Sequence, residues 1–344
     1  MMSGAKQGRE KLRSVVERVL VDPTLGVVVL LAVFALFAAI ALPVFYAGNN
    51  LFNLLGSSIT VMILAIGVTV VLISGGIDLS VGAVMALCAG TAASAMKLGA
   101  PVFVAFIAAL VVGIAAGLLN GFLVTRVGLP DFIATLATLG FASGVLYIWT
   151  EGVPIIGYMT PEFSLVGGLQ ALVGQVTLPM VIAAVLAVIV GWMLSRTSLG
   201  TRFFAVGSNP VAARQSGIPV RLIKTQAYIV SGTCAAIAGI ILAGRNNNVP
   251  ADLGTGYEIQ AISAAIIGGA SLMGGRGRVL GAVLGALTLA LAINIINLVG
   301  VPSSYQKIVI GVILLTAVGA NFLSDRVRAG VLRQRAIRHL SNVA

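Results

Sequence analysis

Long apolar stretches, separated by short groups of polar, Gly or Pro residues, run through almost the whole chain. A helix needs about 20 apolar residues to cross roughly 30 Å of hydrocarbon at about 1.5 Å per residue. Runs of about that length lie near residues 25–46, 52–73, 79–96, 102–124, 132–150, 178–195, 224–243, 257–274, 279–299 and 305–323. The pattern predicts about ten transmembrane helices, and the short gaps between many of them predict antiparallel neighbours.

The composition indicates the same class of protein. Of the 344 residues, 59% are hydrophobic and 9% are charged, and the mean hydropathy is +1.09. A soluble chain could not bury so much apolar surface. We therefore predict an all-α integral membrane protein with a single transmembrane domain at 25–323, a basic segment at 1–24 and a basic tail at 324–344. The first apolar run exceeds the length of a secretory signal core, so we expect it to be a retained span.

The distribution of Lys and Arg predicts the orientation of the chain. Cytoplasmic loops of membrane proteins are enriched in these residues. With the N-terminus inside, eighteen of the 21 Lys and Arg residues fall on the cytoplasmic side, and only Lys97, Arg245 and Lys307 fall outside. We predict that both termini are cytoplasmic. This topology explains the net charge of +11, which therefore gives no reason to expect a nucleic-acid partner.

The sequence lacks the usual residues of an enzyme or an ion-coupled carrier. None of its lysines lies in a GxxxxGKS or GxxxxGKT phosphate-binding loop, and its one histidine, His339, is in the tail. Cys88 and Cys234 lie inside predicted spans, where a thiol usually acts as a small hydrophobe. Away from their end turns the predicted spans hold no charged residue, whereas ion or proton coupling generally requires one. We predict a protein that is not an enzyme, with no cofactor and no metal site.

Neutral polar residues inside the spans are candidates for a substrate pathway. They suit an uncharged, hydroxylated solute, which needs hydrogen-bond partners but no counter-charge. The candidates are Asn120, Thr138, Gln260, Asn294 and Asn297. Asn294 and Asn297 share one helix face because they are three residues apart. The alternative role for each residue is a hydrogen bond between neighbouring membrane helices.

Glycines also follow regular spacings. Gly113, Gly117 and Gly121 recur every fourth residue, as do Gly277, Gly281 and Gly285. Small residues at this spacing allow helix backbones to approach closely in membranes. We predict two tightly packed helix contacts at these ridges.

Two further glycine-rich segments fall where an inward-running span turns into an outward-running one. The segment "GGIDLSVG" at 75–82 matches "GGASLMGG" at 268–275 in four of eight positions. We predict tight turns on the cytoplasmic side that act as a hinge or gate. The candidate residues are Gly75, Gly76, Asp78, Ser80, Gly268, Gly269, Gly274 and Gly275.

Asp78 has two possible roles in this turn. It could be the N-cap of the span that begins at Leu79, accepting the backbone N–H of Ser80 or Val81. It could instead form a gating ion pair with an arginine predicted on the same side, namely Arg126, Arg276 or Arg278.

The most basic internal loop, residues 196–223, contains the signals of a short helix. Asn209 can cap the backbone donors, Pro210 fits the first helical position, and Gly217 can supply a left-handed stop. We predict a helix of about seven residues that lies on the cytoplasmic face and is too short and polar to span the membrane.

Three motifs in order resemble a known family. The segments "GGIDLSVG" at 75–82, "VGSNPVAARQSGI" at 206–218 and "GYEIQAISAAIIGGASLMGGRG" at 256–277 are similar to the permease subunit of the bacterial ATP-binding-cassette importers for ribose, xylose and arabinose. The likeness extends from about residue 50 to 323. It implies a sugar permease of the bacterial inner membrane, paired with a second permease copy, an ATPase subunit and a secreted sugar-binding protein.

The resemblance also implies roles for particular residues. The ATPase-coupling loop would include Gly207, Asn209, Pro210, Ala212, Ala213, Arg214 and Gly217. The external segment 151–177 would meet the binding protein, together with Arg245, Asp252 and Glu258. The alternative function is a self-sufficient facilitator or channel for a small uncharged polar solute.

Overall fold

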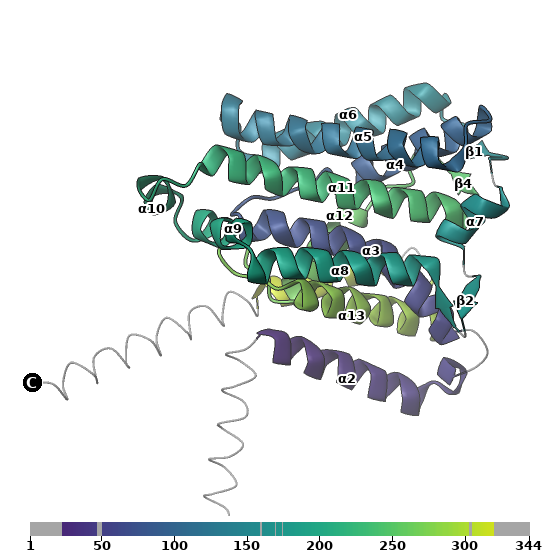
Figure 1. The fold of residues 1–344 in the computed structure, drawn as a ribbon. Helices are drawn as coiled ribbons and strands as arrows, with labels where there is room; N and C mark the ends of the chain where they lie inside the picture. Colours follow the sequence, from purple (N-terminus) through teal and green to yellow (C-terminus); the bar gives the residue numbers. More distant parts are fainter. Residues whose placement is uncertain are drawn as a thin grey trace, which may run out of the picture.

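The computed structural model describes residues 23–46, 50–158, 160–168, 170–173, 175–302 and 305–319, and these ranges form one bundle of helices (Figure 1). Within them, seven helices are long and apolar enough to cross a membrane. They are α2 (Pro23–Ala41), α3 (Asn50–Ile73), α5 (Val102–Phe122), α6 (Asp131–Thr150), α8 (Leu178–Arg196), α11 (Val220–Asn246) and α13 (Val279–Leu298). The all-α membrane class is thus confirmed. The predicted basic segment up to residue 22 and the tail at 324–344 lie outside the described residues.

Three shorter apolar helices accompany the seven long ones in the described ranges. They are α4 (Val81–Lys97), α12 (Tyr257–Ile267) and a helix at Gln306–Gly319. Helix α12 covers only the first part of the run predicted at 257–274, because the chain turns at Gly268 and Gly269, and Gly269 has a φ of +88°. A five-residue π-helix, η2 (Leu123–Val127), extends α5.

Small elements fill the loops. A 3₁₀ turn, η1 (Pro43–Tyr46), follows α2, and α7 (Pro161–Gly167), α9 (Ser198–Ser208) and α10 (Pro210–Gln215) are short helices. Strand β1 (Ile155–Ile156) pairs antiparallel with β4 (Asn248–Val249), and β2 (Ala171–Val173) pairs with β3 (Val176–Thr177). The described parts of segment 151–177 therefore contain regular structure. They are fixed to the end of α11 where the Tyr158 hydroxyl donates to the Ala243 carbonyl at 2.9 Å.

Helices α3 and α11 form the centre of the bundle. The most apolar window of α3 is 89% buried and that of α11 is 78% buried, whereas the window of α2 is 11% buried. Exposed apolar side chains cover the outer helices, such as Ile40 on α2 and Val188 on α8. In a membrane these side chains meet lipid, so their exposure does not destabilise the fold.

The two glycine ridges lie at close helix contacts, as predicted. A Cβ added at Gly113 on α5 would overlap the Gly232 carbonyl on α11 and lie 2.8 Å from the Ala236 Cβ. A Cβ at Gly281 on α13 would overlap the carbonyl of Gly268, just after α12. Because glycine has no side chain, α5 can pack closely on α11, and α13 can pack on the end of α12.

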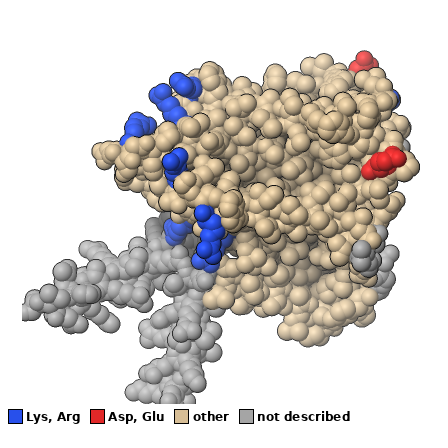
Figure 2. Space-filling model, in the orientation of Figure 1, with Lys and Arg blue, Asp and Glu red and all other residues tan. Residues whose placement is uncertain are grey.

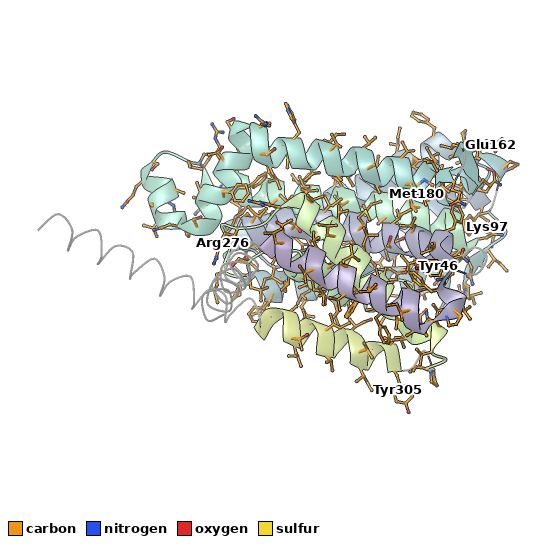
Figure 3. The ribbon with its side chains drawn as sticks, turned by 90° about the horizontal axis from the view of Figure 1, so that it is seen from below. Tyr46, Lys97, Glu162, Met180, Arg276 and Tyr305 are labelled. Carbon is orange, nitrogen blue, oxygen red and sulfur yellow. The ribbon has the colours of Figure 1, made fainter. Side chains whose placement is uncertain are left out.

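The two ends of the bundle differ in charge. Most of the Lys and Arg visible in Figure 2 lie at the end that carries α9 and α10 in Figure 1, and the visible Asp and Glu lie at the opposite end. Figure 3 places Arg276 at the first end and Lys97 and Glu162 at the second. We call the first the basic end and the second, which holds β1, β4 and α7, the far end.

Candidate functional site

Four glycines from three separate motifs meet at the basic end. Gly75 follows α3, Gly207 is in the last turn of α9, and Gly274 and Gly275 lie between α12 and α13. The Gly275 N–H donates to the Ile73 carbonyl at 2.9 Å, and a Cβ added at Gly274 would lie 2.9 Å from the Gly75 Cα. A Cβ at Gly207 would overlap that Ile73 carbonyl and lie 2.7 Å from the Gly275 nitrogen. We call these four residues the glycine junction.

Helix α10 begins two residues after the end of α9 and is closed at both ends. The Asn209 side-chain oxygen accepts the N–H groups of Val211 and Ala212 at 3.1 and 3.0 Å. At the other end, the Gly217 N–H donates to Arg214 and the Ile218 N–H to Ala213, with Gly217 at a φ of +79°. This pair of bonds is a Schellman motif. The predicted short capped helix is confirmed, with six residues in place of about seven.

Most of α10 is exposed at the basic end. Pro210, Val211, Ala212 and Arg214 are exposed, and only Ala213 is buried. Asn209 and Gly217, which close the helix, are also exposed. The predicted coupling-loop residues therefore form a surface that another protein could reach, apart from Ala213 and the buried Gly207.

Helix α9 has no counterpart in the sequence analysis. It buries Phe203 and Val206, which are three residues apart and face the bundle. The Thr197 hydroxyl accepts the Gly200 N–H at 3.2 Å and so caps its start. That cap and the apolar spacing are the signals that could have predicted it.

Residues 74–80, between α3 and α4, run along one face of α11, and we call them the extended segment. Three side chains of α11 reach this segment, at positions 224, 228 and 231, which recur at the spacing of one helix face. The Lys224 ammonium donates to the Gly75 carbonyl at 3.2 Å, and the Tyr228 hydroxyl donates to the Ile77 carbonyl at 3.3 Å. Lys224 also forms an ion pair with Asp131, the first residue of α6, at 3.5 Å.

Asp78 is the third point of attachment and is only 2% exposed. One carboxylate oxygen accepts the N–H and the hydroxyl of Ser80 at 2.9 and 2.6 Å. The other oxygen accepts the Ser231 hydroxyl at 2.7 Å. The Ser80 hydroxyl in turn accepts an N–H of the Asn120 side chain at 2.8 Å, which adds α5 to the network.

These contacts correct one expectation for Asp78. Helix α4 begins at Val81 and its N-cap is Ser80, so Asp78 is not the N-cap residue itself. It does accept the Ser80 N–H, as the capping hypothesis expected. The hydrogen bonds that hold it come from neutral donors, whereas Arg126, Arg276 and Arg278 are exposed at the basic end. This geometry favours a local structural role for Asp78.

The remaining candidate hinge residues lie close to neighbouring backbone or side chains. A Cβ added at Gly76 would lie 2.9 Å from the Tyr228 hydroxyl and 3.1 Å from an Asp131 carboxylate oxygen. Gly268 packs on Gly281, and Gly269 adopts a positive φ that favours glycine. The two glycine-rich segments meet at Gly75 and Gly274.

The five candidate pathway residues are scattered, and their role stays a prediction. Asn294 on α13 exchanges two hydrogen bonds with Asn50 on α3, at 2.8 and 3.2 Å. Asn297 accepts from Gln306 at 2.7 Å. Thr138 is buried and donates to the carbonyl of Ala134, Asn120 joins the Asp78 network, and Gln260 is half-buried on α12. The contacts of both asparagines of α13 are of the interhelical kind that the alternative role requires.

A cavity of about 790 Å³ opens at the far end. Its walls come from the start of α4, the second half of α6 and the segment 250–258. The lining residues are Ala83, Ala86, Leu139, Ser143, Gly144, Tyr147, Ile148, Gly152, Pro154, Pro250, Ala251, Asp252, Gly254, Thr255 and Glu258. Nothing in the sequence indicated this cavity, because its walls come from segments far apart in the chain. Among the described residues, no three His, Cys, Asp or Glu side chains come together as a metal site would require.

Comparison of the sequence with known proteins identifies one family. Residues 50–318 match the family described as branched-chain amino acid transport system / permease component. The chain belongs to this permease family. The permease is 39% identical to the ribose import permease protein RbsC of Escherichia coli strain K12, over 85% of this chain and 91% of that protein.

Two further relatives widen the comparison. The Haemophilus influenzae ribose import permease protein RbsC is 35% identical, over 86% of this chain and 93% of that protein. The autoinducer 2 import system permease protein LsrC of Salmonella typhi is 36% identical, over 88% and 86%. The permease is therefore a multi-pass protein of the bacterial inner membrane, of the kind found in ATP-binding-cassette sugar importers.

Proposed function

We propose that this permease is the transmembrane subunit of an importer that moves a monosaccharide into the cell. It works with a second permease copy, a separate ATPase and a secreted sugar-binding protein. Its ten spans leave both termini and the basic end in the cytoplasm, and the far end meets the binding protein. The relatives that import ribose and autoinducer 2 support a sugar or sugar-like solute, and the charge of the two ends supports the orientation.

The observation that carries the proposal is the attachment of α10 to the core. The helix is exposed and capped at both ends, so it can present a fixed surface to an ATPase. Its N-terminal neighbour, Gly207, packs without a side chain against the Ile73 carbonyl and Gly275. Its C-terminal neighbour is α11, whose Lys224 holds Gly75. A movement of α10 would therefore reach the extended segment from both sides.

The self-sufficient facilitator remains the rival function. A facilitator equilibrates its solute without an ATPase, so α10 would have no ATPase to bind.

A branched-chain amino acid is the rival solute, because the description of the matched family mentions it. Uptake of D-ribose, D-xylose and L-arabinose, compared with uptake of L-leucine, separates the two classes of solute.

ATP hydrolysis by the reconstituted importer tests the docking of the ATPase on α10. The permease, a candidate ATPase subunit and a candidate sugar-binding protein are placed in proteoliposomes, and hydrolysis is measured with and without sugar. We expect sugar-loaded binding protein to stimulate hydrolysis, and Ala212→Trp on α10 to abolish that stimulation. Thr201→Trp, at an exposed position of α9, is the matched control and should keep it. Equal stimulation with both variants would contradict docking on α10.

A further inference from the structure

We infer that the cavity at the far end is a sugar-binding vestibule of the permease itself, in which Glu258 recognises sugar hydroxyl groups. The inference rests on the proposed function, since it takes a sugar as the solute and the far end as the external side. It adds a saturable site to the permease, so that recognition of the solute does not depend on the binding protein alone.

The size and position of the cavity suit this role. Small-molecule pockets usually measure about 300–1,000 Å³, and this cavity measures about 790 Å³. It therefore has room for a monosaccharide and several water molecules. None of its described lining residues belongs to the buried helices α3 and α11.

The lining chemistry matches a neutral polyol. Ser143, Tyr147 and Thr255 offer hydroxyl groups, and Asp252 and Glu258 offer carboxylates that accept hydrogen bonds from sugar hydroxyls. The ring of Tyr147, which is 62% exposed, offers an apolar face. The lining set contains no Lys or Arg, so the carboxylate of an amino acid would face two carboxylates without a cationic side chain. The described lining thus offers hydrogen-bond partners to a neutral polyol but no cationic partner to the carboxylate of an amino acid.

Glu258 is the residue best placed to orient the solute. It lies in the first turn of α12, and one carboxylate oxygen accepts the Gly256 N–H at 3.2 Å. The other oxygen lies beside α4, since a Cβ added at Gly82 would be 2.5 Å from it. The carboxylate is therefore close to the N-terminal ends of two helices, whose dipoles attract negatively charged groups. An ionised carboxylate makes stronger hydrogen bonds to hydroxyl donors than a neutral acceptor does.

The wall of the vestibule is continuous with the extended segment. Ala83 lines the cavity, Gly82 meets Glu258, and Ser80 is bonded to Asp78. Only four residues of chain separate Asp78 from Ala83 in the cavity wall. A shift of the extended segment during the transport cycle would therefore also move the wall beside Glu258.

Filling the cavity is the first test. Gly144 lines the cavity, whereas Gly140 lies one turn earlier on α6 and outside the lining set. A Cβ added at either glycine would meet no neighbouring described atom within 4 Å. Leucine should therefore be accommodated at either position. In the reconstituted importer we expect Gly144→Leu to lower sugar uptake by about tenfold or more, while Gly140→Leu stays within about twofold of wild type. Equal uptake by Gly144→Leu and wild type would overturn the inference.

Protection of an introduced cysteine is the second test. Cys88 and Cys234 are buried, so the background reaction with a membrane-impermeant maleimide should be low. The probe is whichever of D-ribose, D-xylose and L-arabinose the wild-type importer takes up fastest. We expect it to slow labelling of Ser143→Cys in a saturable manner, and not to slow labelling of Lys97→Cys, which is exposed at the far end.

The role of Glu258 is tested in the same background. Glu258→Gln keeps an acceptor for the Gly256 N–H but removes the charge. We expect the sugar concentration that gives half-protection to rise about tenfold, as for the loss of one charge-assisted hydrogen bond. The inference would be overturned if the transported sugar gave no protection. It would also be overturned if glycerol gave the same protection and Glu258→Gln left the protection unchanged. Wild-type uptake driven by ATP in the same preparation would show that the proposed function still holds in either case.

Discussion

Gly207→Ala is the sharpest perturbation of the glycine junction. The added methyl group would overlap the Ile73 carbonyl and lie 2.7 Å from the Gly275 nitrogen. Both neighbours are backbone atoms, so neither can move aside as the end of a flexible side chain could. The Gly275 to Ile73 hydrogen bond, now 2.9 Å long, lies on this side of Gly207 and must stretch or break.

The expected cost follows from two effects. Overpacking of a tight contact typically costs about 1–3 kcal/mol, and a lost hydrogen bond costs about 0.5–1.5 kcal/mol. We therefore expect Gly207→Ala to lower the free energy of unfolding by about 2–4 kcal/mol. The junction joins α9 to the turns after α3 and α12, so coupling between the ATPase and transport should be lost as well.

Thermal unfolding of the purified permease in detergent measures the loss of stability. Sugar uptake by the reconstituted importer measures the loss of coupling. Gly191→Ala on α8 is the control, because its Cβ would meet the nearest neighbouring side-chain atom, the Val279 Cβ, at an ordinary 3.8 Å. We expect the control to unfold and transport like wild type. If Gly207→Ala also retained the wild-type unfolding temperature and uptake rate, the tight junction would not exist in the working protein.

Substitutions at three further positions probe the elements that meet the junction. Asp78→Asn should keep most transport, because an amide oxygen can still accept from Ser80. Asp78→Ala leaves buried donors unpaired, so it should lower the free energy of unfolding by about 3 kcal/mol or more and abolish uptake. Loss of uptake with both variants at equal unfolding temperature would favour a role for the charge. Asn209→Ala should weaken α10 by about 1 kcal/mol and reduce sugar-stimulated ATP hydrolysis, and unchanged hydrolysis would contradict the need for a capped helix. Lys224→Met removes the bond to Gly75 and the ion pair with Asp131 but keeps an unbranched side chain one heavy atom shorter. We expect slower uptake with ATP hydrolysis retained, and a fully coupled variant would show that this contact is dispensable.

The local elements were the most predictable part of the fold. The positions of the apolar helices follow from runs long enough to cross hydrocarbon, and helix α10 follows from Asn209, Pro210 and Gly217, whose capping chemistry is local. The close helix contacts at Gly113 and Gly281 were also predictable, because the four-residue spacing of the glycines is visible in the sequence. The ends of short apolar helices were harder to predict. In the run at 257–274, only the glycines indicate that α12 ends at Ile267.

The candidate site was only partly predictable. The sequence singled out Gly75, Gly207 and Gly274 in three separate motifs, but only the packing shows that they touch. The same limit applies to Asp78, whose partner Ser231 lies 153 residues away. The cavity was missed because hydrophobic periodicity identifies spans and says nothing of the spaces between them. Neutral residues such as Asn294 form contacts between helices, and these use the same hydrogen-bonding groups that solute binding would use.

Sugar accumulation in proteoliposomes tests the central claim most directly. Vesicles that contain the permease and its ATPase, with ATP on the ATPase side and sugar-binding protein on the other, are compared with vesicles that lack each component in turn. We predict accumulation of sugar above the external concentration only when the permease, ATPase, ATP and binding protein are all present. Equilibration of the sugar by the permease alone, at the rate of the complete set and without accumulation, would contradict the account and identify a facilitator.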